Sequence, residues 1–235
     1  MKLLFILFIL SVIIIRTGKI KIFTFFLNYM NIILKSCSIH DNKPYYNHKI
    51  LKECIILKDN WRIFRNEALG TYENYSTITN DLFFNDSLVD KQADWTKLYI
   101  KWYSDIDDIA LKQCPKSCEI IKKLPNIKLA MFSVLAPGTR IKAHKGLYKG
   151  CLRFHLGLST PNSDNCFIVV DNKKYSWKDG EGILIDDTYE HWVHNNTDKK
   201  RIILFCDIVR PLNNIGSILN NFLINNLGKY TSREN

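Results

Sequence analysis

The chain has 235 residues, of which 46% are hydrophobic, and it carries a formal net charge of +10. This length supports one domain with a sizeable core and excludes two large domains once an N-terminal apolar stretch is set aside. The positive charge would suit nucleic acid, but the lysines are scattered and no aromatic-rich basic motif accompanies them. We therefore expect no nucleic-acid partner.

The N-terminus is strongly apolar. Residues 3–15 form a run broken only by Ser11, and basic residues flank the run on both sides. It is shorter than the ~20 residues that cross a bilayer, and no cleavage site of the small-x-small type follows it. A second stretch, 22–34, mixes aromatic and polar residues, so it either completes a tilted transmembrane helix or lies in the membrane interface. We predict a membrane anchor within residues 1–35, in the endoplasmic reticulum or another secretory-pathway membrane, without a defined orientation.

Composition divides the rest of the chain into a polar linker at 36–51, one domain at 52–213 and a C-terminal tail at 214–235. Apolar stripes predict helices at 60–69 and 114–123. Short β-type runs separated by turn-forming pairs predict strands at 129–135, 151–158, 166–170, 182–185 and 201–208. Strands at this spacing predict a mainly-β sandwich or jelly roll with flanking N-terminal helices.

The seven cysteines are too dispersed for a small disulfide scaffold and form no paired CxxC zinc motif. Cys114 and Cys118 are the nearest local pair, and they are either a disulfide in an oxidising lumen or two ordinary thiols. The Asn-x-Ser/Thr sequons at Asn74, Asn85 and Asn195 would be glycosylated only if the domain faces such a lumen.

Two histidines of the β region are candidate metal ligands. His144 follows a Pro-Gly turn, and His191 follows the acidic stretch 186–190. In a jelly roll, such positions at loop edges meet at one mouth of the sandwich, where imidazoles suit Fe(II) and leave coordination positions open. The alternative for each histidine is an ordinary surface or hydrogen-bonded core residue.

Three further polar residues interrupt apolar strands. Arg201 opens an otherwise nearly continuous apolar strand, and a charge that enters a core needs a partner. The arginine fork matches a carboxylate with two hydrogen bonds, so we expect a small-molecule carboxylate as the counter-ion. Arg153 and His155 alternate with apolar residues and therefore share one face of their strand, which is either the interior or the exposed face of an edge strand.

Taken together, these residues resemble the aspartyl/asparaginyl β-hydroxylase family, in order, from about residue 56 to 213. The resembling stretches are 60–69, 114–118, 132–139, 144–146, 152–158, Trp177, 186–191 and 201–211. The resemblance implies a double-stranded β-helix of the jelly-roll or cupin type. It also implies a dioxygenase that uses Fe(II), 2-oxoglutarate and O2 to hydroxylate an unactivated carbon, with release of succinate and CO2.

The resemblance assigns roles to individual residues. His144 and His191 fall on the iron ligands, and the 2-oxoglutarate-binding positions fall on Ser133, Arg153, His155 and Arg201. Most 2-oxoglutarate oxygenases carry a carboxylate two residues after the first histidine, but here that residue is Gly146, a gap that the family shares. The resemblance then implies water at the vacant coordination position.

Three neighbours of the histidines have open roles. Asp186 and Asp187 either orient His191 or form a solvated turn. Lys145 places a basic group beside the metal site, where it either opposes iron or selects an acidic substrate.

We expect the substrate to be the β-carbon of Asp or Asn residues in a protein or peptide. The alternatives are a lipid acyl chain, as in a bacterial branch that hydroxylates lipid A, and a non-catalytic β-helix binding module. The joint presence of His144, His191 and Arg201 argues against the binding module.

Overall fold

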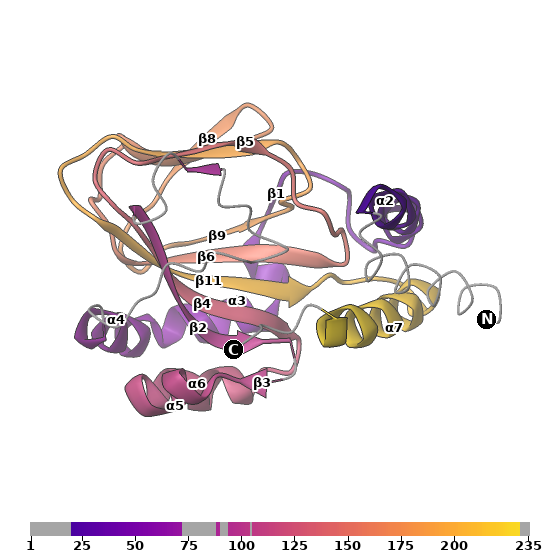
Figure 1. Cartoon of the computed structure of the whole chain (residues 1–235), viewed down its shortest axis with the longest axis horizontal. Helices are drawn as coiled ribbons and strands as arrows, with labels where there is room; N and C mark the ends of the chain where they lie inside the picture. The colour runs from indigo at the N-terminus through magenta and orange to yellow at the C-terminus, as the bar shows by residue number, and fades with distance from the viewer. Residues whose placement is uncertain (1–19, 72–87, 90–93, 104, 231–235) are drawn as a thin grey trace.

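The computed structural model describes residues 20–71, 88–89, 94–103 and 105–230. Two β-sheets face each other in a cupin-like β-sandwich, and helices flank the larger sheet (Figure 1). Among the described residues, the strand order is β1-β9-β6-β11-β4-β2-β3 in the large sheet and β5-β10-β7-β8 in the small sheet. From β4 onward the chain repeatedly crosses between the two sheets. The predicted mainly-β sandwich with flanking helices is therefore confirmed.

The large sheet consists of β1 (Tyr45–Tyr46), β2 (Trp95–Trp102), β3 (Asp105–Ile106), β4 (Ile127–Leu135), β6 (Cys151–Ser159), β9 (Gly182–Ile185) and β11 (Arg201–Val209). The small sheet consists of β5 (Arg140–His144), β7 (Cys166–Val170), β8 (Lys173–Ser176) and β10 (His191–Asn195). All five predicted strands are present. The sequence missed β1, β2, β3, β5, β8 and β10, and all of these except β2 are too short or too polar to show a clear period of two.

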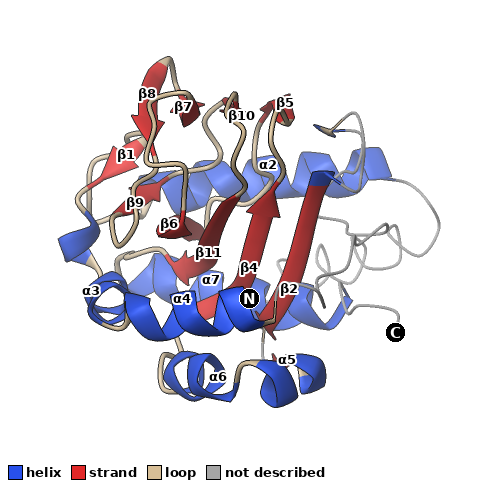
Figure 2. Ribbon diagram, turned by 90° about the vertical axis from the view of Figure 1, so that its left-hand side faces the viewer, coloured by secondary structure: helices blue, strands red, loops and turns tan. Residues whose placement is uncertain are grey.

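The helices are α2 (Ile20–Ser36), α3 (Lys52–Asp59), α4 (Trp61–Gly70), α5 (Asp108–Gln113), α6 (Pro115–Lys122) and α7 (Asn214–Tyr230), with a 3₁₀ turn at His48–Ile50. Helices α3 to α6 lie on the outer face of the large sheet, and α2 and α7 lie together at one end of the sandwich (Figures 1 and 2). The helices predicted at 60–69 and 114–123 are confirmed as α4 and α6.

Strand β4 separates two cores. Met131 packs between the two sheets, whereas its neighbour Phe132 packs between the large sheet and the helices. The central strands β4 and β11 are thus buried on both faces, which explains why they read as continuous apolar runs in the sequence.

The two cysteines of the α5–α6 junction are free thiols. Cys114 and Cys118 are both buried, and a hydrogen bond joins their side chains. Of the two alternatives for this pair, a disulfide or two ordinary thiols, the structure contains the two thiols.

Helix α2 covers the second half of the predicted membrane anchor, and the run 3–15 lies outside the described residues. No helix in the described part of the chain is long and apolar enough to span a bilayer. Instead, α2 buries Leu27, Met30 and Leu34 in a cluster with residues of α7. The Asn31 side chain also donates a hydrogen bond to the Leu147 carbonyl, at 2.9 Å. Helix α2 is therefore packed against the domain through Leu27, Met30 and Leu34.

Two further segments differ from the prediction. Within 36–51, predicted as a linker, Tyr45 and Tyr46 pair with Ile185 and Leu184 at the edge of the large sheet. A two-residue strand is too short to show periodicity, so the sequence could not reveal it. Within 214–235, predicted as a tail, α7 extends to Tyr230. Its apolar residues are interspersed with Asn, which masked the helical stripe.

We predict that Leu34→Ala lowers the free energy of unfolding by about 2–5 kcal/mol, because Leu34 is fully buried against α7. Urea unfolding checks this value. Ile32→Ala is the matched control, since Ile32 is 67% exposed on the same helix, and its effect should stay within about 0.5 kcal/mol. Equal effects of the two variants would mean that α2 does not pack as described.

Candidate active site

His144 and His191 meet between the two sheets. His144 ends β5 and His191 begins β10, and the two residues are antiparallel cross-strand partners. Their ring centroids lie 4.1 Å apart. Nδ1 of His144 donates a hydrogen bond to the Lys142 carbonyl at 2.7 Å, and Nδ1 of His191 donates one to the Tyr189 carbonyl at 2.9 Å. These bonds fix each ring and leave each Nε2 as the atom that can bind a metal.

Both imidazoles are neutral at neutral pH. Burial, reinforced by the neighbouring His144, lowers the pKa of His191 to about 3. Burial also lowers the pKa of His144. A neutral imidazole is the form that binds a metal ion. In the part of the chain that the structure describes, no group of three or more His, Cys, Asp or Glu side chains is arranged to hold a metal. The candidate centre is thus a pair of histidines.

A carboxylate occupies the space beside Gly146. The Gly146 N–H donates a hydrogen bond to the Asp187 carbonyl, at 2.8 Å. A Cβ added to Gly146 would lie only 2.1 Å from Oδ2 of Asp187. A side chain at 146 and the present position of Asp187 are therefore mutually exclusive. The place two residues after the first histidine is filled by a carboxylate from another segment of the chain.

Arg153 holds Asp187 in this place. Its Nη1 lies 2.7 Å from Oδ2 of Asp187. Its Nε and Nη2 donate hydrogen bonds to the two carboxylate oxygens of Asp207, its cross-strand partner, at 2.8 and 3.0 Å. The guanidinium thus faces two carboxylates within the protein itself. Arg153 lines the cavity where the sequence placed it, but its fork is already engaged.

Arg201 lacks such partners. It is 2% exposed, and only Nη2 makes a protein hydrogen bond among the described residues, to the Ser133 hydroxyl at 3.3 Å. Nε has no partner, and no carboxylate of the described residues forms an ion pair with it. Burial lowers the pKa of Arg201 to about 10, so the side chain stays charged at neutral pH. A buried charge without a counter-ion costs several kcal/mol, which indicates that the site binds an anion.

Other polar groups without a partner in the described part of the chain lie near Arg201. His155 has no hydrogen-bond partner on either ring nitrogen, and the Trp177 indole N–H has none, within the described residues. Burial, followed by the charge of Arg201, lowers the pKa of His155 well below its usual value, so its ring is neutral. The Arg201 guanidinium lies 4.7 Å from the centre of a Trp177 ring. These groups fit a small carboxylate ligand, as the resemblance implies for 2-oxoglutarate.

The structure brings together all six residues that the sequence predicted for the site. The cavity beneath the imidazoles is lined by Trp95, Ser133, Ile141, His144, Arg153, His155, Ile168, His191, Val193, Arg201, Ile203 and Phe205. Of the two alternatives for Arg153 and His155, the interior face is the correct one. His194, on the same strand as His191, does not line this cavity, because the period of two directs its side chain toward Phe167.

Asp186 anchors the turn that leads to His191. It is fully buried, and its Oδ2 lies 2.7 Å from Nζ of Lys149 and also accepts a hydrogen bond from Nη2 of Arg210. Burial alone would raise its pKa, but Arg210 and Lys149 hold the pKa below the usual value. Asp186 therefore positions the turn, while the Tyr189 carbonyl orients the imidazole.

The sequence analysis did not single out Asp207, Lys149 or Arg210. Asp207 had a usable signal, because it is a charge in the same apolar strand as Arg201, and the argument that a buried charge needs a partner applies to both. Lys149 had no such signal, since it lies in a stretch of mixed polarity, whereas Arg210 directly follows the same apolar strand and carried the same signal as Asp207.

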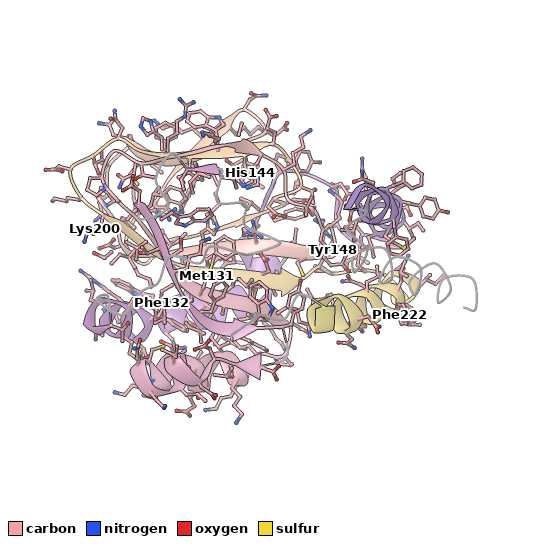
Figure 3. The ribbon with its side chains drawn as sticks, in the orientation of Figure 1. Met131, Phe132, His144, Tyr148, Lys200 and Phe222 are labelled. Atoms are coloured by element: carbon pink, nitrogen blue, oxygen red, sulfur yellow. The ribbon has the colours of Figure 1, made fainter. Side chains whose placement is uncertain are left out.

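A second cavity adjoins the first. It is lined by Tyr103, Lys128, Leu129, residues 144–148, Cys151, Arg153, Asp187, Asp207 and Ile224. It shares His144 and Arg153 with the first cavity. Figure 3 shows Tyr148 at the end of the sandwich that faces α2 and α7, with Lys200 at the opposite end. The second cavity therefore lies at the end of the sandwich where α2 and α7 pack.

A family model and several known proteins are similar in sequence to this chain. The family model described as aspartyl/asparaginyl beta-hydroxylase matches residues 58–211. The chain is 34% identical over 164 residues to the ornithine lipid ester-linked acyl 2-hydroxylase of Rhizobium tropici, covering 69% of the chain and 56% of that relative. It is 28% identical over 161 residues to the human aspartyl/asparaginyl beta-hydroxylase, covering 66% of the chain and 21% of that relative.

Among solved structures, the chain is similar to a Pseudomonas putida prolyl-4-hydroxylase, with a TM-score of 0.41 and 13% identity, over 65% of the chain and 87% of that structure. The chain spans 56% of the length of the rhizobial relative and 21% of the human one.

Proposed function

The chain belongs to the aspartyl/asparaginyl β-hydroxylase family of dioxygenases, and from that premise we propose that it is an Fe(II)- and 2-oxoglutarate-dependent hydroxylase. His144 and His191 hold the iron, and Arg201 binds the distal carboxylate of 2-oxoglutarate. The observation that carries the proposal is the buried Arg201 guanidinium, which lacks a carboxylate partner among the described residues and lines the same cavity as the two imidazoles. A non-catalytic binding module would not require this combination.

In the proposed reaction, O2 and 2-oxoglutarate together supply the oxygen atom and the electrons for hydroxylation of the substrate. One oxygen atom of O2 enters a C–H bond of the substrate as a hydroxyl group. The other enters succinate, as the bond between C1 and C2 of 2-oxoglutarate breaks and C1 leaves as CO2. Iron, when bound, supplies the activation of O2.

The protein's part is positioning and electrostatics. The carbonyls of Lys142 and Tyr189 fix the two ring orientations before any ligand arrives. The donors of Arg201, with Ser133, supply the hydrogen bonds that a carboxylate needs, in a buried cavity where such bonds are stronger than in water. The Asp187 carboxylate offers a hydrogen-bond acceptor beside His144, on the side where the third protein ligand of related oxygenases would stand.

For the substrate, we propose a lipid acyl chain. The sequence alone favoured Asp or Asn residues of a protein, but two observations now support the lipid alternative. The rhizobial relative, whose name specifies a lipid acyl hydroxylase, matches at 34% identity. The packed helix α2 also presents exposed apolar side chains at the end of the sandwich that carries the second cavity. Protein Asp/Asn hydroxylation is the second candidate, supported by the match to the human relative.

We predict that His144→Ala and His191→Ala each abolish Fe(II) binding and reduce succinate formation at least a hundredfold, because each removes one of two metal-binding nitrogens. Succinate is measured with Fe(II), 2-oxoglutarate, ascorbate and O2, since turnover without a substrate needs no knowledge of that substrate. His194→Ala is the matched control because it lies on the same strand but outside the cavity, and it should retain activity. Full activity of either ligand variant would refute the metal site.

A second expectation concerns Arg201→Lys. A lysine keeps the charge but loses the fork, so the concentration of 2-oxoglutarate needed for half-maximal turnover should rise about tenfold or more, while bound Fe(II) stays the same. Titration of 2-oxoglutarate in the succinate assay gives the first value, and metal analysis gives the second. An unchanged requirement would place the cosubstrate elsewhere.

We further propose that the protein acts at a membrane surface. Phe25, Tyr29 and Ile32 share the outward face of α2 and are 76%, 54% and 67% exposed. The apolar run 3–15 precedes this helix in the sequence. A helix with one face packed on the domain and an apolar outward face is suited to lie in the plane of the interface rather than to span the bilayer.

This arrangement predicts where the chain touches a vesicle. An environment-sensitive fluorophore on Tyr29→Cys should shift to the blue when phosphatidylglycerol vesicles are added, because the label enters an apolar environment. The same label on Ile109→Cys, which is 56% exposed on α5, should not shift. If the label at position 29 stays in water while the protein sediments with vesicles, the membrane contact lies elsewhere in the chain.

A further inference from the structure

The second cavity contains two lysines for which neither the fold nor the proposed reaction has a use. We infer that Lys128 and Lys145 form a cationic subsite that binds the carboxylate of an amphiphilic substrate, with the apolar part of that substrate against the neighbouring aliphatic walls. The inference rests on the proposed function and extends it by naming the group that the enzyme recognises.

The position of the cavity suits a substrate. It shares His144 and Arg153 with the cavity assigned to 2-oxoglutarate, so both cavities border the same imidazole. A molecule in the second cavity would therefore lie beside the metal ligand without displacing the cosubstrate.

The charges of the cavity leave the lysines without acidic partners. Its two carboxylates, Asp187 and Asp207, are both engaged by Arg153. Neither Lys128 nor Lys145 forms an ion pair with any residue that the structure describes. Lys128 also lies near a second cation, because its charge, after burial, lowers the pKa of Lys101. The lining thus has an excess of positive charge, which favours an anionic ligand.

The aliphatic residues that line the second cavity indicate that the anionic ligand also has an apolar part. Leu129, Leu147 and Ile224 contribute aliphatic surface to the same cavity. Leu147 is 44% exposed, and its carbonyl accepts the hydrogen bond from Asn31 of α2. The cavity therefore adjoins the helix whose outward face is apolar. A membrane amphiphile with a carboxylate matches this combination of charge and apolar surface better than a solvated peptide does.

The test compares two amphiphiles of equal acyl length, N-lauroylglycine with a carboxylate and N-lauroylethanolamine without one. Calorimetric titration of the full chain, below the micelle concentrations, measures binding without any turnover. We expect wild type to prefer the carboxylate about fivefold or more, as one charge-assisted hydrogen bond at a half-exposed site would give. Lys128→Ala with Lys145→Ala should abolish this preference.

Two further variants separate charge from folding. Lys128→Arg with Lys145→Arg keeps the charges and should keep the preference. Lys122→Ala removes an exposed lysine of α6 that does not line the cavity, and this variant should also keep the preference. An equal preference in wild type and the double alanine variant would overturn the inference. A second result would also overturn the inference. If an Asp-containing peptide bound in a lysine-dependent way and the two amphiphiles bound equally well, the substrate would be a protein.

The outcome is independent of the proposed reaction. If wild type forms no succinate but discriminates between the amphiphiles through the two lysines, the subsite stands and the proposed oxygenase fails. If succinate forms and discrimination is absent, the oxygenase stands and the subsite fails.

Discussion

The ion-pair arrangement around Arg153 is the interaction on which the geometry of the site depends. A single guanidinium joins strand β6, strand β11 and the turn before β10, through two bonds to Asp207 and one contact with Asp187. Because all three side chains are largely buried, the loss of one partner would leave an uncompensated charge, at a cost of about 3–5 kcal/mol. The Asp187 carboxylate is thereby held against Gly146, in the lining of the second cavity.

Asp186 and Asp187, which are adjacent in the turn before His191, bind different partners. Asp186 contacts Lys149 and Arg210, whereas Asp187 contacts Arg153 and lies near the first histidine. Because each side chain is held by its own basic partners, both aspartates tie the turn before His191 to the domain. The Tyr189 carbonyl can then hold the His191 ring in place, so the orientation of the nitrogen that we propose to bind the metal is set by the protein itself.

The sequence predicted the centre of the site better than its surroundings, for a physical reason. Arg201 and His155 interrupt apolar strands. A charge that enters a core needs a partner, and a period of two shows that Arg153 and His155 share one face, although not which face. The partnership of Arg153 with Asp207 could not be predicted in the same way, because it depends on which strands pair and in what register. The displacement of Asp187 into the space beside Gly146 depends on the distance between two loops, which no periodicity encodes.

For a similar reason, the sequence alone did not determine whether the N-terminal apolar segment contacts a membrane or the protein. An apolar stripe with interspersed Asn and Tyr is compatible with a membrane interface and with a helix packed on a protein, since both remove one face from water. In the structure, α2 buries Met30 and Leu34 on the domain and leaves Phe25 and Ile32 outside. The helix is held to the domain by its inner face. Through Asn31 it also contacts the loop at Leu147, which lines the second cavity, so the helix and this loop keep a fixed position relative to each other. A membrane that bound the outer face of α2 would therefore fix the direction from which a substrate reaches His144. The depth of α2 in the membrane interface would then determine which carbon of an acyl chain comes nearest to the imidazoles.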